Sequence, residues 1–380
     1  MLIDGVYDVT IIIEGVELFS CGSAFNIVCK IEESVCDNIP ICKLVFGSSK
    51  EFIDKLPIVD GTRIIIKIHS DQLNINEQLC FRTVRTSFVP SGDYVMYSIS
   101  GIIDFYELFR DPIKYSMNNN SSEIFKKIVQ DNQITGIIHQ TQDKQLWSPT
   151  ESNLYQWMSY IASHAWSTPQ SGFYWFMNRR RNLYFIDIDK LIHESKNIIC
   201  FHYGNTTYDD IQQNKIRYGN FSVDISHGDE NLFNRGYDGE NSHFDLLSYA
   251  TKTENAKKVR ATSEIVNINK ELSHGLGKNI LQFDIGNHHK NYFLSEAQNR
   301  RVLSTYSTYI KLSCDFFRPL NLSQVCTIDA SSPNSSATKL NTMKIKYIIS
   351  KIVTNISSSK VNMNVELCSQ GYNGNSTESY

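Results

Sequence analysis

Six short runs rich in β-forming residues follow one another in the first part of the chain, and turn signals separate them. Glu14-Gly15, Asp60-Gly61 and Pro90-Ser91-Gly92-Asp93 are typical of turns between strands. Six strands at this spacing form a small antiparallel barrel or sandwich. We therefore predict a first β-barrel over residues 1–106. Its expected strands are Tyr7 to Ile13, Phe25 to Ile31, Lys43 to Phe46, Arg63 to His69, Phe81 to Phe88 and Tyr94 to Phe105.

A second β-rich region has a similar layout, but a polar stretch interrupts it. It covers residues 200–228 and 307–368, and we expect residues 229–306 to be irregular, with one helix from Ser295 to about Tyr306. Both regions contain a turn, a strand, an interruption and a long hairpin, which in the second runs from Met343 to Cys368. This layout predicts a duplicated barrel whose second copy is split by an inserted domain. Identities between the copies are few, so the residues alone leave the duplication open.

Residues 107–199 have a different pattern and form the predicted middle domain, of α+β type. Ser121-Ser122-Glu123 leads into a short amphipathic helix, and Ser148-Pro149-Thr150-Glu151 has the form of a capping box. The stripe that follows predicts a helix from Leu154 to Ala165. Phe173 to Met177 and Leu183 to Ile188 flank a polar turn, which predicts a β-hairpin. The residues of the helical stripe are Leu154, Trp157, Met158 and Ile161.

The stretch from Tyr155 to Asp189 contains ten of the chain's aromatic Tyr, Trp and Phe residues. An enzyme pocket, a membrane-facing patch and the core of a small domain would each concentrate aromatic rings in this way. The helical stripe followed by a hairpin favours a core made by one helix on one hairpin. The turn of that hairpin, Arg179-Arg180-Arg181, is expected to be solvated or to contact a partner protein.

Composition disfavours a membrane-spanning protein, a secreted protein and a protein built on disulfides. Lys+Arg 37 against Asp+Glu 40 gives a net charge of -3, and no segment approaches the roughly 20 apolar residues of a membrane span. The opening residues, Met1 to Gly5, lack the pattern of a signal peptide. Nine scattered cysteines without a C-x-x-C motif predict reduced thiols. Residues 369–380 are polar and predict a flexible tail.

No set of residues predicts catalysis or a bound cofactor. The pair His288-His289 has one nearby carboxylate, Asp284, and no cysteine, so a surface loop is favoured over a metal site. His274-Gly275-Leu276-Gly277-Lys278-Asn279 lacks the upstream glycine and the Ser/Thr of a phosphate loop. Asp187 and Asp189 share one face of the hairpin, which we interpret as a solvated strand face. We predict no catalytic residue, no metal and no cofactor.

The order of these elements resembles the baseplate hub protein of contractile-tailed bacteriophages, which is related to the N-terminal part of the secretion spike protein VgrG. The resemblance covers the chain to about residue 370. It rests on the helix and aromatic hairpin above, on Tyr309 to Cys314 with Leu320 to Val325, and on the hairpin Met343 to Cys368. Members of this family carry two tail-tube-like barrels of one fold, the second split by an insertion, with an α+β domain between them.

The resemblance implies a structural protein of the virion tail, assembled in the host cytoplasm. It implies a homotrimer that joins a sixfold tail tube to a threefold central spike, with tail tube and baseplate wedge proteins as partners and DNA only in transit. No spike region or lysozyme-like segment follows, so we expect the spike to be a separate chain. The balanced charge agrees with a conduit, since a lumen lined with Lys and Arg would retain passing DNA.

Two other functions are left open by the sequence. The hub of a phage-like injection or secretion machine would have the same architecture. A β-rich carbohydrate-active hydrolase or binding module would instead use the aromatic stretch as a sugar platform. In that case Trp157, Trp166 and Trp175 would line an open groove with Asp187 and Asp189.

Overall fold

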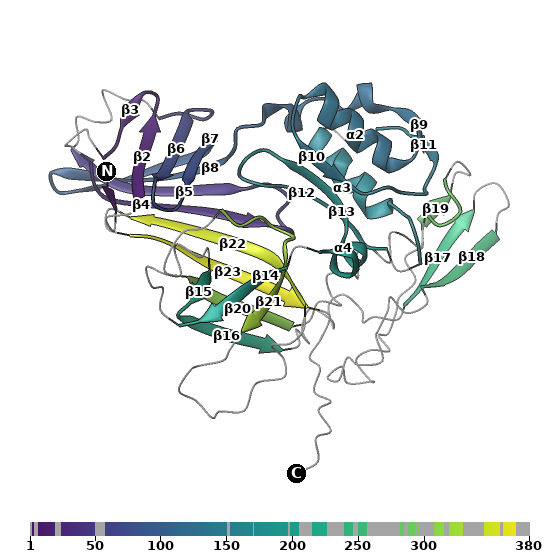
Figure 1. Ribbon diagram of the computed structural model, residues 1–380. Helices are drawn as coiled ribbons and strands as arrows, with labels where there is room; N and C mark the ends of the chain where they lie inside the picture. Colours follow the sequence, from purple (N-terminus) through teal and green to yellow (C-terminus); the bar gives the residue numbers. More distant parts are fainter. Residues whose placement is uncertain are drawn as a thin grey trace, which may run out of the picture.

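The protein is mainly β, and the helices whose bounds the structure describes lie between Tyr106 and Glu194 (Figure 1). The computed structural model shows how three parts of the chain are arranged: the first β region, the middle domain and the second β region. The residues that it describes are 2–3, 7–19, 24–49, 58–149, 153–169, 171–196, 198–204, 215–225, 239–245, 250–256, 282–284, 288–292, 295, 299, 308–314, 319–329, 346–357 and 360–369.

The first β region is an antiparallel sheet in the order β2-β6-β7-β8-β5-β4. All six predicted runs are strands, because alternate apolar side chains point into one buried face. In β6, for example, Ile64, Ile66 and Ile68 are fully buried. The strands are β2 (Tyr7–Ile13), β4 (Ala24–Ser34), β5 (Ile41–Ser49), β6 (Arg63–Ser70), β7 (Ile75–Ser91) and β8 (Tyr94–Ile103), with β1 (Leu2–Ile3) and β3 (Val16–Glu17) paired to β2.

The second β region has the order β14-β21-β22-β23-β20-β16, with β15 beside β14. It departs from the antiparallel arrangement that we predicted, because β14 runs parallel to both β21 and β15. Parallel neighbours need a long crossover, and the chain between β14 and β21 provides one. The strands are β14 (Ile199–Tyr203), β15 (Ile216–Tyr218), β16 (Asn220–Ile225), β20 (Thr308–Cys314), β21 (Val325–Asp329), β22 (Tyr347–Ser357) and β23 (Val361–Ser369).

The two β regions have the same strand order. We number the six main strands of each region from one to six along the chain, leaving out β15. Across the sheet both regions then have the order one, four, five, six, three, two. Among the described residues no pairing joins the two ends of either set, so closure of each region into a barrel stays a prediction. Instead β4 pairs with β22, which makes both regions parts of one 15-stranded sheet (Figure 1).

The middle domain contains two short sheets, β10-β13-β12 and β9-β11, with α2 and α3 packed against them. The cap of α3 differs from our prediction. Asn153 is its N-cap and accepts a hydrogen bond from the N–H of Gln156 at 2.9 Å, because the helix begins at Leu154 and not next to Ser148. The elements are η1 (Tyr106–Phe109), η2 (Ile113–Tyr115), β9 (Met117–Asn119), α2 (Ser121–Asp131), β10 (Gly136–Ile138), β11 (Gln145–Trp147), α3 (Leu154–His164), β12 (Phe173–Met177), β13 (Leu183–Asp187) and α4 (Ile188–Glu194).

The aromatic stretch forms a buried core, as the sequence predicted. Phe125 of α2 stacks on Phe185 of β13 with ring centroids 3.9 Å apart. Trp157 and Trp175 are almost completely buried. One helix face and one hairpin face therefore close on each other, which is how a small α+β unit removes its apolar surface from water.

The inserted segment is more regular than expected. It contains a three-stranded sheet of β17 (Gly239–Asp245), β18 (Ala250–Ala256) and β19 (Gln282–Asp284). The predicted helix from Ser295 lies mostly outside the described residues, as does the predicted tail. Asn299 is described: it accepts a hydrogen bond from the N–H of Phe173 and donates to the carbonyls of Ala162 and Ala165, which ties this part of the chain to the middle domain.

Candidate functional site

The arginine turn lies where the middle domain meets the sheet. Arg179 is buried and its guanidinium donates to the Glu33 carboxylate of β4 at 2.6 Å. Its backbone N–H donates to the same carboxylate at 2.8 Å. Arg180 forms a bidentate pair with Glu77 of β7, and the guanidinium of Arg181 lies over the ring of Phe105. All three arginines contact the first β region. The prediction of a solvated turn was wrong for Arg179, which is buried, whereas Arg180 and Arg181 remain exposed to solvent.

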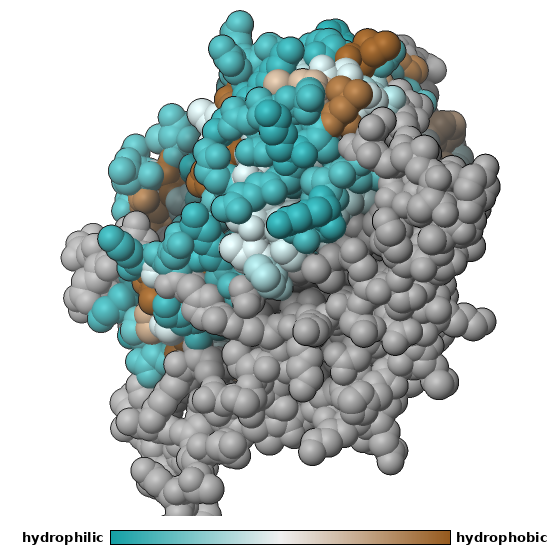
Figure 2. All heavy atoms as spheres, turned by 90° about the vertical axis from the view of Figure 1, so that its right-hand side faces the viewer, coloured by the Kyte–Doolittle hydropathy of each residue, from teal (hydrophilic) through white to brown (hydrophobic). Residues whose placement is uncertain are grey.

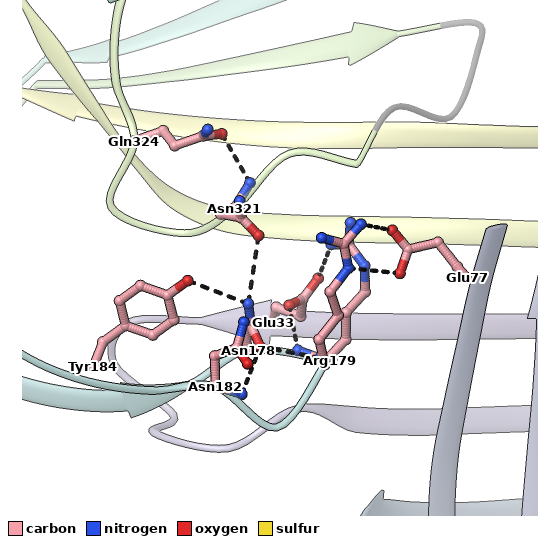
Figure 3. A network of polar contacts seen from close by, with 9 residues as sticks. Glu33, Glu77, Asn178, Arg179, Asn182, Tyr184, Asn321 and Gln324 are labelled. Atoms are coloured by element: carbon pink, nitrogen blue, oxygen red, sulfur yellow. Dashed lines mark hydrogen bonds and ion pairs between the residues drawn. The ribbon is translucent and has the colours of Figure 1, made fainter. Parts of the chain in front are cut away.

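The same turn also reaches the second β region (Figure 3). The side-chain amide of Asn178 donates to the hydroxyl of Tyr184 at 3.3 Å and to the Oδ1 of Asn321 at 3.4 Å. The backbone N–H of Asn321 donates to Gln324 just before β21. One five-residue turn thus holds the middle domain against both β regions.

The exposed face of the sheet carries paired charges. Glu32 of β4 lies within 3.4 Å of Lys30 on its own strand, Lys43 on β5 and Lys351 on β22. Burial acts to raise the pKa of Glu32, but hydrogen bonds from Lys30 and Lys43 outweigh it and hold that pKa at about 2. The carboxylate is therefore charged at any physiological pH, and it neutralises part of the surrounding positive charge.

A similar pair lies on the second β region. Lys311 of β20 contacts Asp224 of β16 at 2.9 Å. These strands border a hollow of about 620 Å³ that also includes Lys351 and Glu366. Carboxylates thus lie among the lysines of this face: Glu32 contacts three of them and Asp224 contacts Lys311.

Solved structures identify the fold. No protein-family model matches the sequence, and no curated protein matches it. The tail protein from Neisseria meningitidis MC58 is similar with a TM-score of 0.54 at 10% identity, over 96% of this chain and 96% of that one. The 43 kDa tail protein of prophage MuSo2 from Shewanella oneidensis is similar with a TM-score of 0.56 at 10% identity, over 96% and 97%.

The chain has the fold of these tail proteins. A component of the type VI secretion system of E. coli is also similar, with a TM-score of 0.49 at 11% identity, over 95% of this chain and 78% of that one. The resemblance to phage tail proteins that the order of elements predicted is confirmed at the level of the fold.

The three tryptophans that a sugar platform would expose are buried. Trp157 and Trp175 are fully enclosed in the middle domain, and Trp166 is 6% exposed. On the face at the right of Figure 1, the described residues of the middle domain are mostly hydrophilic, with hydrophobic ones in small separate groups (Figure 2). This surface differs from both the sugar platform and the membrane-facing patch considered from the sequence.

The two histidines at 288 and 289 have structural contacts. The Nε2 of His289 lies 3.0 Å from the carbonyl oxygen of His164, and the backbone N–H of His289 donates to the side-chain oxygen of Gln145. The ring of His288 stacks on Tyr292. Burial lowers the pKa of His289. The described residues contain no group of three potential metal ligands, and none of their helices is long and apolar enough to cross a membrane.

Asp187 is buried, contrary to the prediction of a solvated strand face. It is the last residue of β13 and 5% exposed, because Gly172 and the start of α4 cover it. Burial raises its pKa to about 6, although its carboxylate accepts a hydrogen bond from the N–H of Gly172 at 3.0 Å. Asp189 lies beyond it in the first turn of α4, so the two carboxylates do not share one strand face.

We expect Asp187→Asn to change how the stability of this tail-protein fold depends on pH. The pKa of Asp187 is near 6 in the folded protein and about 3.9 in the unfolded chain. The protonated carboxyl therefore contributes stability that is fully present below pH 4 and is lost as the pH rises through 6. Asparagine cannot ionise but can still accept from Gly172. The unfolding free energy of the variant relative to wild type should therefore rise by about 2–3 kcal/mol between pH 4 and pH 7. Urea unfolding of both proteins across this range measures it, and a constant difference would contradict the assignment.

Proposed function

We propose that the chain is the structural hub of a phage tail baseplate, without catalytic activity. Three copies form a ring that joins a sixfold tail tube to a threefold central spike and provides a conduit for DNA. The observation that carries this proposal is the identical strand order of the two β regions, which are joined in one sheet through β4 and β22. Two similar units per chain, taken three times, supply six similar units in a closed threefold oligomer.

The domains then have separate roles. The two β regions, residues 1–106 and residues 200–228 with 307–368, form the ring wall. The middle domain, residues 107–199, and the insertion, residues 229–306, occur once per chain and lie outside that wall, where baseplate wedge proteins bind. The arginine turn supports this division because it holds the middle domain against both β regions. A spike protein is a partner of this ring, and the assembly belongs to the virion tail.

We expect the purified protein to be a trimer at high concentration or with its spike. The reason is that a ring made of two similar units per chain closes with three chains. Light scattering should give three times the monomer mass. A stable dimer, or a monomer that persists with the spike bound, would rule out the proposed hub.

We expect the trimer to bind DNA weakly. Glu32 and Asp224 offset part of the lysine charge on the exposed face of the sheet, which weakens the attraction of this face for phosphates. Binding of duplex DNA at about 150 mM salt should be no tighter than the roughly 10⁻⁴–10⁻⁶ M of non-specific contacts. As a control, Glu32→Gln removes a carboxylate that contacts three lysines and should tighten binding and steepen its salt dependence. Tight binding by the wild type would contradict a conduit.

A further inference from the structure

The junction between the two β regions provides a pattern for contacts between chains. A bulge between Ile349 and Lys351 shifts the register between β22 and β23 by one residue. Beyond this bulge β22 also pairs with β4, on the side away from β23. That antiparallel pairing runs from Lys351↔Ser34 to Ser357↔Val28. It is the only strand contact among the described residues that joins the two regions.

In the first β region, the counterpart of β22 is β7, which has the same shape but no such partner. Its bulge lies between Thr83 and Arg85, and six residues separate Arg85 from Ser91 at the turn, as six separate Lys351 from Ser357. Beyond the bulge, however, β7 pairs only with β8 among the described residues. Phe88 is 56% exposed there and Val89 is 64% exposed.

The counterpart of β4 is β16, and it too has an open side. It pairs only with β20 in the described part of the chain, and Phe221 on it is exposed. The correspondence extends to single residues. Lys43 of β5 pairs with Ser100 of β8, and Lys311 of β20 pairs with Glu366 of β23. Ser100 and Glu366 lie at the same distance along their strands from the preceding hairpin turn, so the two lysines are equivalent. The ion pair Lys43–Glu32 is then repeated as Lys311–Asp224.

We propose that β7 of one copy pairs with β16 of the next copy, antiparallel, and so repeats the β22–β4 junction between chains. This inference rests on the proposed ring and specifies its interface. The equivalence of the strands sets the register between chains. Within the chain Val353 pairs with Glu32, so between chains Ser87 should pair with Asp224. In the same way the pair of Asn355 with Lys30 predicts a pair of Val89 with Ser222.

Charge at the two edges agrees with this register. Lys351 reaches Glu32 across the intrachain junction at 3.4 Å. The residues in the same places are Arg85 on β7 and Asp224 on β16, again one cation and one carboxylate. Pro90 has no N–H to donate, and proline within sheets is confined to edge strands, strand starts and bulges, which agrees with β7 being an edge beyond its bulge.

The pairing closes the proposed ring. Among the described residues, the strand path from β7 through β8, β5, β4, β22, β23 and β20 to β16 has no further partner along β7 beyond its bulge and along one side of β16. Three copies of these eight strands form one continuous barrel. Strands about 4.8 Å apart and tilted by about 40° give it a backbone diameter of roughly 45–50 Å. Barrels of 16–18 strands already enclose an aqueous channel, so this one is wide enough for a conduit.

Disulfide trapping tests the register. In the proposed pair the Cα atoms of Val89 and Ser222 lie about 4.5–5.5 Å apart, within the range that a disulfide spans. Both side chains are exposed, so Val89→Cys with Ser222→Cys should fold. Mild oxidation should convert the double variant to covalent dimers and trimers on a denaturing gel. The matched control is Lys67→Cys with Ser222→Cys, since Lys67 is exposed on β6, away from the proposed edge; this variant and the wild type should remain monomers on the gel.

Light scattering of the same samples separates the two levels of the argument. A trimer that leaves Val89→Cys with Ser222→Cys uncrosslinked, or in which the Lys67 control crosslinks equally, overturns the strand pairing and leaves the hub. A stable dimer, or a monomer that persists with the spike bound, overturns both when no crosslinks form.

A charge exchange provides a second readout. Arg85→Glu places like charges together and should raise the concentration at which half of the trimer dissociates by about fivefold or more. Adding Asp224→Lys to that variant should restore most of the loss. No weakening by Arg85→Glu, or no recovery in the double variant, overturns the assigned register.

Discussion

Arg179→Ala is expected to lower the free energy of unfolding by about 3–5 kcal/mol. Its guanidinium and the Glu33 carboxylate are both 1% exposed and lie 2.6 Å apart. Removing the arginine leaves a buried carboxylate without its cation, which is costlier than the net gain from the intact pair. Because the pair joins the middle domain to β4, the loss should appear as release of that domain at lower urea than the sheet requires.

The neighbouring arginine provides the matched control. Arg181 lies in the same turn, with its guanidinium 5.4 Å from the centroid of the Phe105 ring, so Arg181→Ala should cost about 1 kcal/mol or less. Replacing both members of the buried pair, by Arg179→Met with Glu33→Leu, should recover most of the loss, since the uncompensated charge is gone. A cost below about 1 kcal/mol for Arg179→Ala would mean that Glu33 is solvated.

Trp157→Ala is expected to lower the stability of the middle domain by about 3–5 kcal/mol. The indole is fully buried on the inner face of α3 and stacks on Tyr160 with ring centroids 5.3 Å apart. Its removal leaves a cavity that the helix and the hairpin cannot both close. All four tryptophans of the chain lie in this domain, so intrinsic fluorescence follows its unfolding separately from that of the β regions.

Trp157→Phe distinguishes lost packing from lost polarity. The indole N–H of Trp157 has no hydrogen-bond partner in the described structure, so phenylalanine gives up volume but no hydrogen bond. We expect it to cost clearly less than alanine. A loss under about 1 kcal/mol for Trp157→Ala would indicate an exposed ring and would revive the sugar-platform function.

The hairpin shows how far sequence patterns reach. Phe173 to Met177 and Leu183 to Ile188 were predicted as strands, and β12 and β13 occupy those residues to within one position. The prediction of a solvated turn was wrong at Arg179, since a run of three arginines does not indicate which of them is buried against a carboxylate. Glu33 is 146 residues away from Arg179 and Glu77 is 103 residues away from Arg180, so no local pattern could indicate these pairs.

The duplication had a weaker sequence signal. Two similar layouts of turns and strands pointed to it, but few identities supported it. The shared strand order and the matching pairs Lys43–Glu32 and Lys311–Asp224 emerge only when the strands are assembled. A bulge moves the register by one residue without changing composition, so neither bulge was visible in the sequence.

The sequence by itself determined which segments are strands and helices and which of their faces are buried, as in β6 and α3. Those properties depend on side chains two to four residues apart, whose spacing can be read directly. Only the tertiary structure decided that β4 joins β22, that Arg179 is buried against Glu33, and that β7 beyond its bulge and β16 each have one partner strand among the described residues. The physical reason is that strands pair through backbone N–H and C=O groups, which every residue except proline carries, so the choice of partner depends on the whole fold.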